Sequence, residues 1–390
     1  MRKNDLEIQE WLKQRKAQSL YRSTRLVSTP QQPVMVVDGQ EIVSFCSNDY
    51  LGMANHPEVI KAFSDAASRY GVGAGASHLV SGHSQAHAEL EQALAEFTGR
   101  DAVLLFSTGY MANLGVVSAL IGRGDSVFQD RLNHASLIDA GLLSGAKVMR
   151  YKHNDLQSLA GRLAKDTASN KMILSDGVFS MDGDMADVSG LVRLSQEYKA
   201  WCLLDDAHGF GVLGKKGAGL LEHTGASQQD VPLLMATLGK AVGVAGAFIA
   251  GSFEHIELLK QLSRTWIYTT AMPPAIAVAS RKSLLLIQRE DWRREKLVSL
   301  ITLFKQGARE RNIQLLPSDT AIQPVFIGDN QAAVETSDHL LKQGIWVTAI
   351  RPPTVPPNTA RLRVTLSAIH TEMQVNRLLD TLAECLKQRD

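Results

Sequence analysis

Short apolar runs of a strand's length alternate with amphipathic stretches between residues 101 and 251. A parallel strand that is buried on both faces reads as a continuous apolar run, and its connecting helix reads as an amphipathic one. The pattern therefore predicts an α/β domain with a mostly parallel sheet. The runs are AVLLF (102–106), SVFQD (126–130), KVMRY (147–151), KMILSD (171–176), WCLLDD (201–206), PLLMATL (232–238) and GAFIAG (246–251).

The flanking segments follow other patterns. Asp38-Gly39 lies between two strand-like runs and predicts a hairpin. Apolar positions at helical spacing predict helices over 5–20, 56–70, 83–98, 275–289, 293–310 and 332–343, and QPVFIG (323–328), IWVTAI (345–350) and RLRVTL (361–366) read as strands. We expect an N-terminal arm over 1–50, a large domain over 51–285 and a smaller α+β domain over 286–390.

Composition and charge narrow the possible partners. The 390 residues carry 41 Lys and Arg against 40 Asp and Glu, so neither nucleic acid nor an anionic membrane is indicated. No apolar run is long enough to cross a bilayer, and the charged N-terminus MRKNDLEIQEWLKQRK lacks the apolar stretch of a signal peptide. The three cysteines are scattered, without the spacing of a disulfide framework or a zinc site. We expect a cytoplasmic protein without a metal site or a membrane partner.

Polar and reactive residues follow the predicted strands. Ligands of parallel sheets bind beyond the carboxyl ends of the strands, so these residues should meet at one edge. In chain order they are STGYMAN (107–113), His134 in RLNHAS, Ser180 in SDGVFSMDGD, Asp205 and His208 in DDAHGFG, and Thr237 and Lys240 in TLGKAVG.

Lys240 allows two interpretations when it is considered alone. It could be a solvated lysine on a tight turn, or an amine kept reactive for a covalent bond. The combined set favours the second, because pyridoxal 5'-phosphate needs a lysine for its aldehyde, a carboxylate for its ring nitrogen and backbone donors for its phosphate. The sequence therefore predicts this cofactor.

The ordered motifs also resemble those of the α-oxoamine synthases, and the resemblance runs from about residue 20 to the end of the chain. The motifs are SNDYLG (47–52), the glycine-rich segment 71–82, FSTGYMAN (106–113), RLNHAS, GVFSMDGD (177–184), DDAHGFG and TLGKAVG. Members of this family are fold-type I pyridoxal-phosphate enzymes that condense an amino acid with an acyl thioester and release carbon dioxide. The resemblance implies a seven-stranded, mostly parallel sheet flanked by helices, with a smaller α+β domain.

The resemblance also implies a role for each matched residue. Lys240 would bind the cofactor's aldehyde covalently, Asp205 would pair with the ring nitrogen, His208 would reach the phenolic oxygen and His134 would stack on the ring. The cofactor and its phosphate would be held by Gly109, Tyr110, Ser180 and Thr237, with Thr269 and Thr270 reaching in from a neighbouring subunit. The substrate contacts would be Arg22, Asn48, His134, Arg351 and Thr354.

The implied partners follow from the same resemblance. The segment AIRPPTVPPNTARLRVTLSA (349–368) is most similar to members that use L-alanine and a pimeloyl thioester, carried by coenzyme A or by acyl carrier protein. Shared active sites imply a homodimer. A sister enzyme that uses glycine or serine, such as a glycine C-acetyltransferase, and a catalytically idle binding relative are the alternatives. Asp176, where the family more often has glutamate, and His78, where many relatives have arginine, depart from the pattern.

Overall fold

The computed structural model describes residues 4–387, and these form two compact units. The larger unit comprises residues 48–180 and 184–295. The smaller unit comprises the described residues up to 47, residues 181–183 and residues 296–387.

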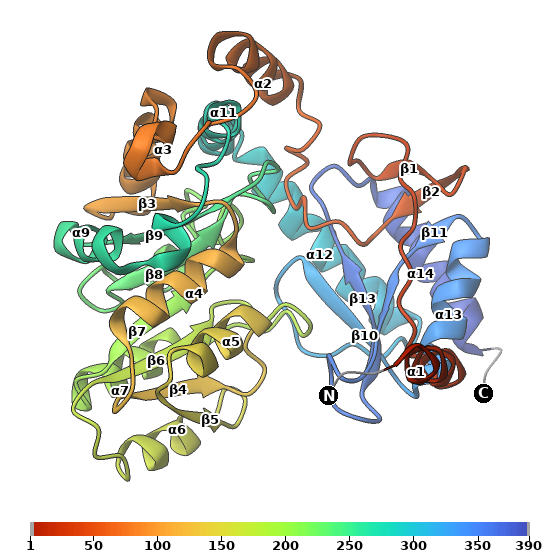
Figure 1. Ribbon diagram of the computed structural model, residues 1–390. Helices are drawn as coiled ribbons and strands as arrows, with labels where there is room; N and C mark the ends of the chain where they lie inside the picture. The colour runs from red at the N-terminus through yellow and green to blue at the C-terminus, as the bar shows by residue number, and fades with distance from the viewer. Residues whose placement is uncertain (1–3, 388–390) are drawn as a thin grey trace. The chain divides into compact units, whose positions relative to one another are not determined.

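The larger unit is built on a seven-stranded sheet with the order β3-β9-β8-β7-β6-β4-β5 (Figure 1). The strands are β3 (Ala102–Phe106), β4 (Ser126–Asp130), β5 (Lys147–Tyr151), β6 (Lys171–Asp176), β7 (Trp201–Asp205), β8 (Leu233–Thr237) and β9 (Ala247–Gly251). Strand β9 runs antiparallel to both neighbours, and the other pairings are parallel. The expected mostly parallel, seven-stranded sheet is confirmed.

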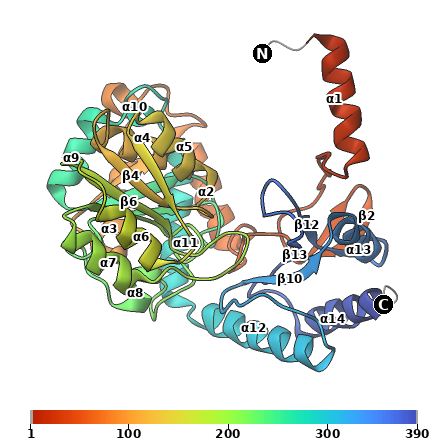
Figure 2. The same ribbon diagram turned by 90° about the horizontal axis from the view of Figure 1, so that it is seen from below.

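Helices cover both faces of this sheet, as Figure 2 shows. On one face α4 (Gly109–Leu120), α5 (Ala135–Leu143), α9 (Phe253–Leu262) and α10 (Arg264–Ile267) share a buried apolar cluster with the strands. The other face is covered by α3 (Gln85–Thr98), α6 (Leu156–Leu163), α7 (Val188–Glu197) and α11 (Pro274–Arg289). Burial on both faces explains the uninterrupted apolar runs in the sequence.

The smaller unit contains two three-stranded sheets. One has the order β1-β2-β11, with β1 (Val34–Val37), β2 (Gln40–Ser44) and β11 (Ile345–Trp346). The other has the order β10-β13-β12, with β10 (Ile322–Gly328), β12 (Thr348–Ile350) and β13 (Ala360–Thr365). The hairpin predicted at Asp38-Gly39 is confirmed, and both residues have positive φ.

The expectation of a single strand over 345–350 was wrong. Ile345 and Trp346 pair in parallel with β2, whereas Thr348–Ile350 pair antiparallel with β13, so the run divides between two sheets at Val347. The carbonyl of Val347 accepts a hydrogen bond from Ser337 Oγ at 2.6 Å. A side chain therefore satisfies that backbone group at the point where the chain changes sheets.

The remaining helices are α1 (Asp5–Ala17), α2 (Pro57–Tyr70), the π-helical turn η1 (His78–Gly82), α8 (Leu220–Thr224), α12 (Trp292–Glu310), α13 (Asn330–Lys342) and α14 (Glu372–Lys387). In the described part of the chain, none of the helices combines the length and the apolar character that crossing a membrane requires.

Candidate active site

A cavity of about 170 Å³ lies at the carboxyl ends of the parallel strands of the larger unit. Eight of the residues singled out in the sequence line it: Gly109, Tyr110, His134, Ser180, Asp205, His208, Thr237 and Lys240. They come from five separate strand ends and meet there because those strands run in the same direction through the sheet.

The Lys240 amine is joined to a chain of polar side chains. Its Nζ lies 2.8 Å from Nε2 of His208. The opposite ring nitrogen of His208, Nδ1, lies 2.5 Å from the hydroxyl of Tyr50, which also donates to Asn48 Oδ1 at 3.3 Å. Tyr50 is fully buried and was not among the predicted site residues, although it stands inside the SNDYLG motif.

The turn that carries Lys240 explains its apolar surroundings. Gly243 N–H closes the turn on the carbonyl of Lys240 at 2.8 Å, with a φ of 73°. A Cβ at Gly243 would lie 2.4 Å from the backbone nitrogen of Ala54. Ala241 and Val242 are buried, whereas Lys240 is half-buried and lines the cavity. Packing behind the turn therefore requires small residues, and of residues 240–243 only Lys240 lines the cavity.

Asp205 is the buried last residue of β7. Its Oδ2 accepts a hydrogen bond from Asn113 Nδ2 at 2.8 Å, and its Oδ1 accepts from the Ala207 N–H at 3.1 Å. Asn113 also donates to Ser136 Oγ at 2.8 Å, and that oxygen lies 2.7 Å from Nδ1 of His134. Asn113 and Ser136 were missed in the sequence, although both lie in quoted motifs; they orient the carboxylate and the imidazole.

His134 and Asp176 meet across two neighbouring strand ends. The backbone N–H of His134 donates to Asp176 Oδ2 at 3.0 Å, so this aspartate reaches its partner without the extra methylene of a glutamate. Burial lowers the pKa of His134 and the Lys240 charge acts in the same direction, while Asp205 opposes both. Burial and the Asp205 charge raise the pKa of Asp176 well above its ordinary value.

The start of α4 supplies donors for an anion. Thr108 is the N-cap residue and accepts from the Met111 N–H at 3.2 Å, so Gly109 and Tyr110 form the first turn. The first N–H groups of a helix have no acceptor within it, and together with the helix dipole they favour phosphate. Thr237 Oγ1, which donates to the Gly246 carbonyl at 2.9 Å, lines the same cavity.

Six predicted residues do not line this cavity, and Asn48, beside Tyr50, is one of them. Arg22, Arg351 and Thr354 line a second cavity, which belongs to the smaller unit. Burial lowers the pKa of Arg351, and the nearby Arg22 charge lowers it further. Thr269 and Thr270 lie in the loop between α10 and α11 and do not line the first cavity.

The first cavity fits pyridoxal 5'-phosphate by the chemistry of its donors. The aldehyde requires an amine, the ring nitrogen a carboxylate, and the phosphate a group of N–H and hydroxyl donors. Lys240, Asp205 and the start of α4 with Thr237 supply these in one cavity.

Known proteins resemble this chain over nearly its full length. The profile of the family described as aminotransferase class I and II matches residues 40–382. An 8-amino-7-oxononanoate synthase of Pseudomonas putida is 58% identical, covering 97% of this chain and 96% of its own. An 8-amino-7-oxononanoate synthase of Saccharophagus degradans is 55% identical, and the match covers 98% of this chain and 97% of that protein. A serine palmitoyltransferase of S. paucimobilis, solved with PLP and myriocin bound, is 29% identical with a TM-score of 0.93. The match covers 98% of this chain and 97% of that chain.

Proposed function

Because this chain belongs to the aminotransferase class I and II family, and within it to the α-oxoamine synthases, we propose that it condenses L-alanine with a pimeloyl thioester. The products are 8-amino-7-oxononanoate, carbon dioxide and the free thiol, so the protein acts as an acyltransferase of biotin biosynthesis. The observation that carries this proposal is one cavity in which the Lys240 amine, the Asp205 carboxylate and the start of α4 converge.

Pyridoxal 5'-phosphate, when bound, supplies an aldehyde that condenses with amines and a protonated ring that accepts electrons from the amino acid's Cα. Lys240 would hold the aldehyde, and Asp205 would hold a proton at the ring nitrogen. Gly109, Tyr110, Ser180 and Thr237 would bind the phosphate side of the cavity.

The protein's own groups would also move the protons of the reaction. Lys240, once released by the incoming alanine, would remove the Cα proton and later return it. His208 contacts Lys240 and is oriented by Tyr50, so it would keep the amine directed at this proton. His134, which lines the cavity, would donate a hydrogen bond to the ketone oxygen of the condensed β-keto acid, where negative charge develops as carbon dioxide leaves.

Substrate recognition would rest on a second group of residues. Arg22 and Arg351 line one cavity with Thr354, and two guanidinium groups suit the terminal carboxylate of a pimeloyl chain. Asn48 lies beside Tyr50 and would contact the amino-acid substrate.

A homodimer would complete the site. The loop that carries Thr269 and Thr270 lies beside the glycine-rich segment, since Ala271 N–H donates to the Ala76 carbonyl at 3.0 Å. Large apolar side chains of both loops face solvent, with Val72 87%, Val80 78% and Tyr268 72% exposed. Apolar groups gathered in this way are typical of a protein interface. A second copy seated here would bring Thr269 and Thr270 to its partner's phosphate.

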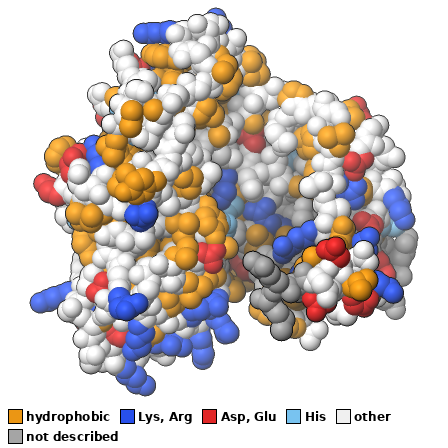
Figure 3. Space-filling model, viewed as in Figure 1, with side chains coloured by type: hydrophobic (Ala, Val, Ile, Leu, Met, Phe, Trp, Pro, Cys, Tyr) orange, Lys and Arg blue, Asp and Glu red, His pale blue; other side chains and the backbone are white. Residues whose placement is uncertain are grey.

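Acyl carrier protein is the favoured donor. Lys and Arg side chains gather over β5 and α6 on the face that Figure 3 shows. The exposed ones there include Lys147, Arg150, Lys152, Arg162 and Lys165. The Arg150 guanidinium donates to the Arg131 carbonyl at 2.5 Å, in the loop that leads to His134. An acidic carrier would be attracted to such a surface. Cys46 and Cys202 carry thiols rather than a disulfide, which suits a reducing cytoplasm.

Carbon dioxide release from carboxyl-labelled L-alanine tests the proposal. We expect release with pimeloyl thioesters, with a lower KM for the carrier-bound donor at low salt than at high salt. With glycine or L-serine in place of L-alanine, kcat/KM should be lower by about 10-fold or more, since a misfit of one small group costs roughly 1–3 kcal/mol. Preference for glycine would assign the chain to a sister condensing enzyme, and no release with any of the three would overturn the proposal.

A further inference from the structure

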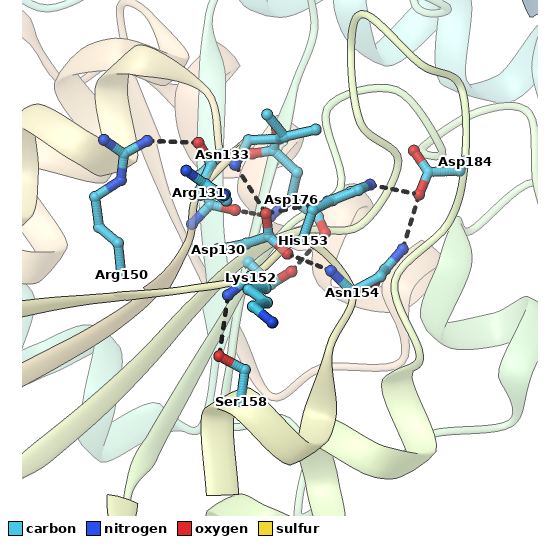
Figure 4. Close-up of polar contacts among 12 residues, drawn as sticks. Asp130, Arg131, Asn133, Arg150, Lys152, His153, Asn154, Ser158, Asp176 and Asp184 are labelled. Atoms are coloured by element: carbon cyan, nitrogen blue, oxygen red, sulfur yellow. Dashed lines mark hydrogen bonds and ion pairs between the residues drawn. The ribbon is translucent and has the colours of Figure 1, made fainter. Parts of the chain in front are cut away.

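Two loops that line the first cavity meet at a histidine outside it. His153 follows β5, and its ring lies between two aspartates (Figure 4). Nδ1 is 3.1 Å from Asp130 Oδ1, and Nε2 is 2.9 Å from Asp184 Oδ2. The ring does not line the cavity.

Each aspartate belongs to a different side of the site. Asp130 ends β4, and its Oδ1 also accepts from the Leu132 N–H at 2.8 Å, which fixes the start of the short loop that ends at His134. Asp184 closes the loop that carries Ser180, since its carbonyl accepts from the Phe179 N–H at 2.9 Å. His153 is therefore bonded at once to the His134 loop and to the Ser180 loop.

The geometry requires a charged ring. Carboxylate oxygens accept hydrogen bonds, so both ring nitrogens must donate, and an imidazole donates from both only when it is protonated. Burial by itself would lower the pKa of His153. The hydrogen bonds and charges of Asp130 and Asp184 outweigh burial and raise this pKa to about 10. The ring is thus a cation at neutral pH.

Neighbouring groups hold the same two carboxylates. Asn154, with a φ of 48°, donates its N–H to Asp130 Oδ2 at 2.8 Å and its Nδ2 to Asp184 Oδ2 at 2.8 Å. Phe179, next to Ser180 in the chain, lies edge-on to the His153 ring with 4.4 Å between centroids. Asp184 Oδ1 is buried and meets no hydrogen-bond partner among the described residues. The positive charge of the imidazolium is therefore the main compensation for the cost of burying the negative charge of Asp184.

We propose that His153 is a positioning residue of the reaction: its imidazolium ties the His134 loop to the Ser180 loop and sets the distance between the two sides of the cavity. This inference rests on the proposed function for its kinetic consequence, but the tie itself is a property of the folded chain. A displacement of about 1 Å at reacting groups costs on the order of 10²-fold in rate.

His153→Gln tests the tie, because the single amide nitrogen of glutamine cannot replace two ring nitrogens that face different aspartates, and glutamine carries no charge. We expect kcat per bound cofactor to fall about 30-fold, while KM for the thioester changes less than threefold. Amide hydrogen exchange should quicken at least tenfold in both 131–134 and 177–187, with β3 unchanged. His223→Gln, an exposed histidine of α8, is the matched control and should equal the wild type.

Asp184→Ala removes the acceptor of His153 Nε2, so it cuts the tie on one side only, and it also serves if His153→Gln does not fold. It should quicken exchange in 177–187 and leave 131–134 protected, because the His153–Asp130 contact remains. Wild-type kcat per bound cofactor in His153→Gln, or faster exchange confined to one loop there, would overturn the proposal. If the wild type fails to condense alanine with a pimeloyl thioester, the proposed function is wrong. The hydrogen-exchange pattern still shows whether His153 holds the two loops together.

Discussion

The hydroxyl of Tyr50 lies 2.5 Å from Nδ1 of His208, and the other nitrogen of that ring lies 2.8 Å from the Lys240 amine. The buried Tyr50 hydroxyl thus fixes the orientation of the His208 ring, so that Nε2 points at the Lys240 amine. The contact joins the SNDYLG segment to the DDAHGFG segment, two motifs that the sequence places 158 residues apart.

Tyr50→Phe should lower kcat about tenfold. The substitution leaves Nδ1 of a buried histidine without its partner, which costs roughly 1–3 kcal/mol, and each 1.4 kcal/mol is tenfold in rate. Steady-state kinetics and the melting temperature check this result. Tyr198→Phe, at the end of α7, is the control. Unchanged kcat in Tyr50→Phe would show that His208 needs no such orientation.

Lys240→Ala should abolish the covalent bond to the cofactor and lower the condensation rate about 10³-fold or more, because both the anchor and the base are lost. Borohydride reduction followed by peptide mapping checks it, since the wild type should carry the reduced adduct at Lys240. Lys61→Ala, at an exposed position of α2, is the control. An adduct retained on another lysine would contradict the assignment.

Asp205→Asn should leave the cofactor bound but slow exchange of the L-alanine Cα proton about 10²-fold or more. The amide can keep the hydrogen bond from Asn113, but it cannot hold the ring nitrogen protonated. Proton NMR in D₂O measures the exchange without any acyl donor. Asp65→Asn, on the surface of α2, should exchange as the wild type does, and an equal rate in Asp205→Asn would refute the role.

Gly243→Ala should lower the free energy of unfolding by at least about 2 kcal/mol. An alanine would have to adopt a positive φ, which costs roughly 1–2 kcal/mol, and its Cβ would meet the Ala54 backbone. Urea unfolding measures the loss. Gly239→Ala in the same turn is the control, because its Cβ would approach only Thr237 Oγ1, at 3.6 Å. Equal effects at both positions would disprove the steric argument.

The stabilisation from His153 should decline in alkali. Its pKa is raised from 6.5 to about 10 on folding, so its contribution is complete below pH 6.5 and is lost as pH rises through about 10. The difference in unfolding free energy between wild type and His153→Gln should shrink by up to about 1.4 kcal/mol per pH unit over this window. Urea unfolding at pH 6, 7.5, 9 and 10 tests it. A constant difference would mean that the ring is not a cation in the folded protein.

The sequence determined the type of sheet and most of the cavity. Strands buried on both faces must be continuously apolar, so their runs could be read without the fold. Ligand groups of parallel sheets collect at the carboxyl ends, so His134, Asp205, His208 and Lys240 could be assigned to one site from strand ends alone. The covalent role of Lys240 followed from the chemistry of this group as a whole.

Only the tertiary structure decided which groups orient these residues. Tyr50, Asn113, Ser136 and His153 are ordinary residue types, and their importance comes from hydrogen bonds to partners distant in the chain. The division of IWVTAI between two sheets also depended on which strands lay beside it. A linear pattern records which side chains must be buried or must react. Long-range packing sets which of them touch, because hydrogen bonds act over about 3 Å in space whatever the separation along the chain.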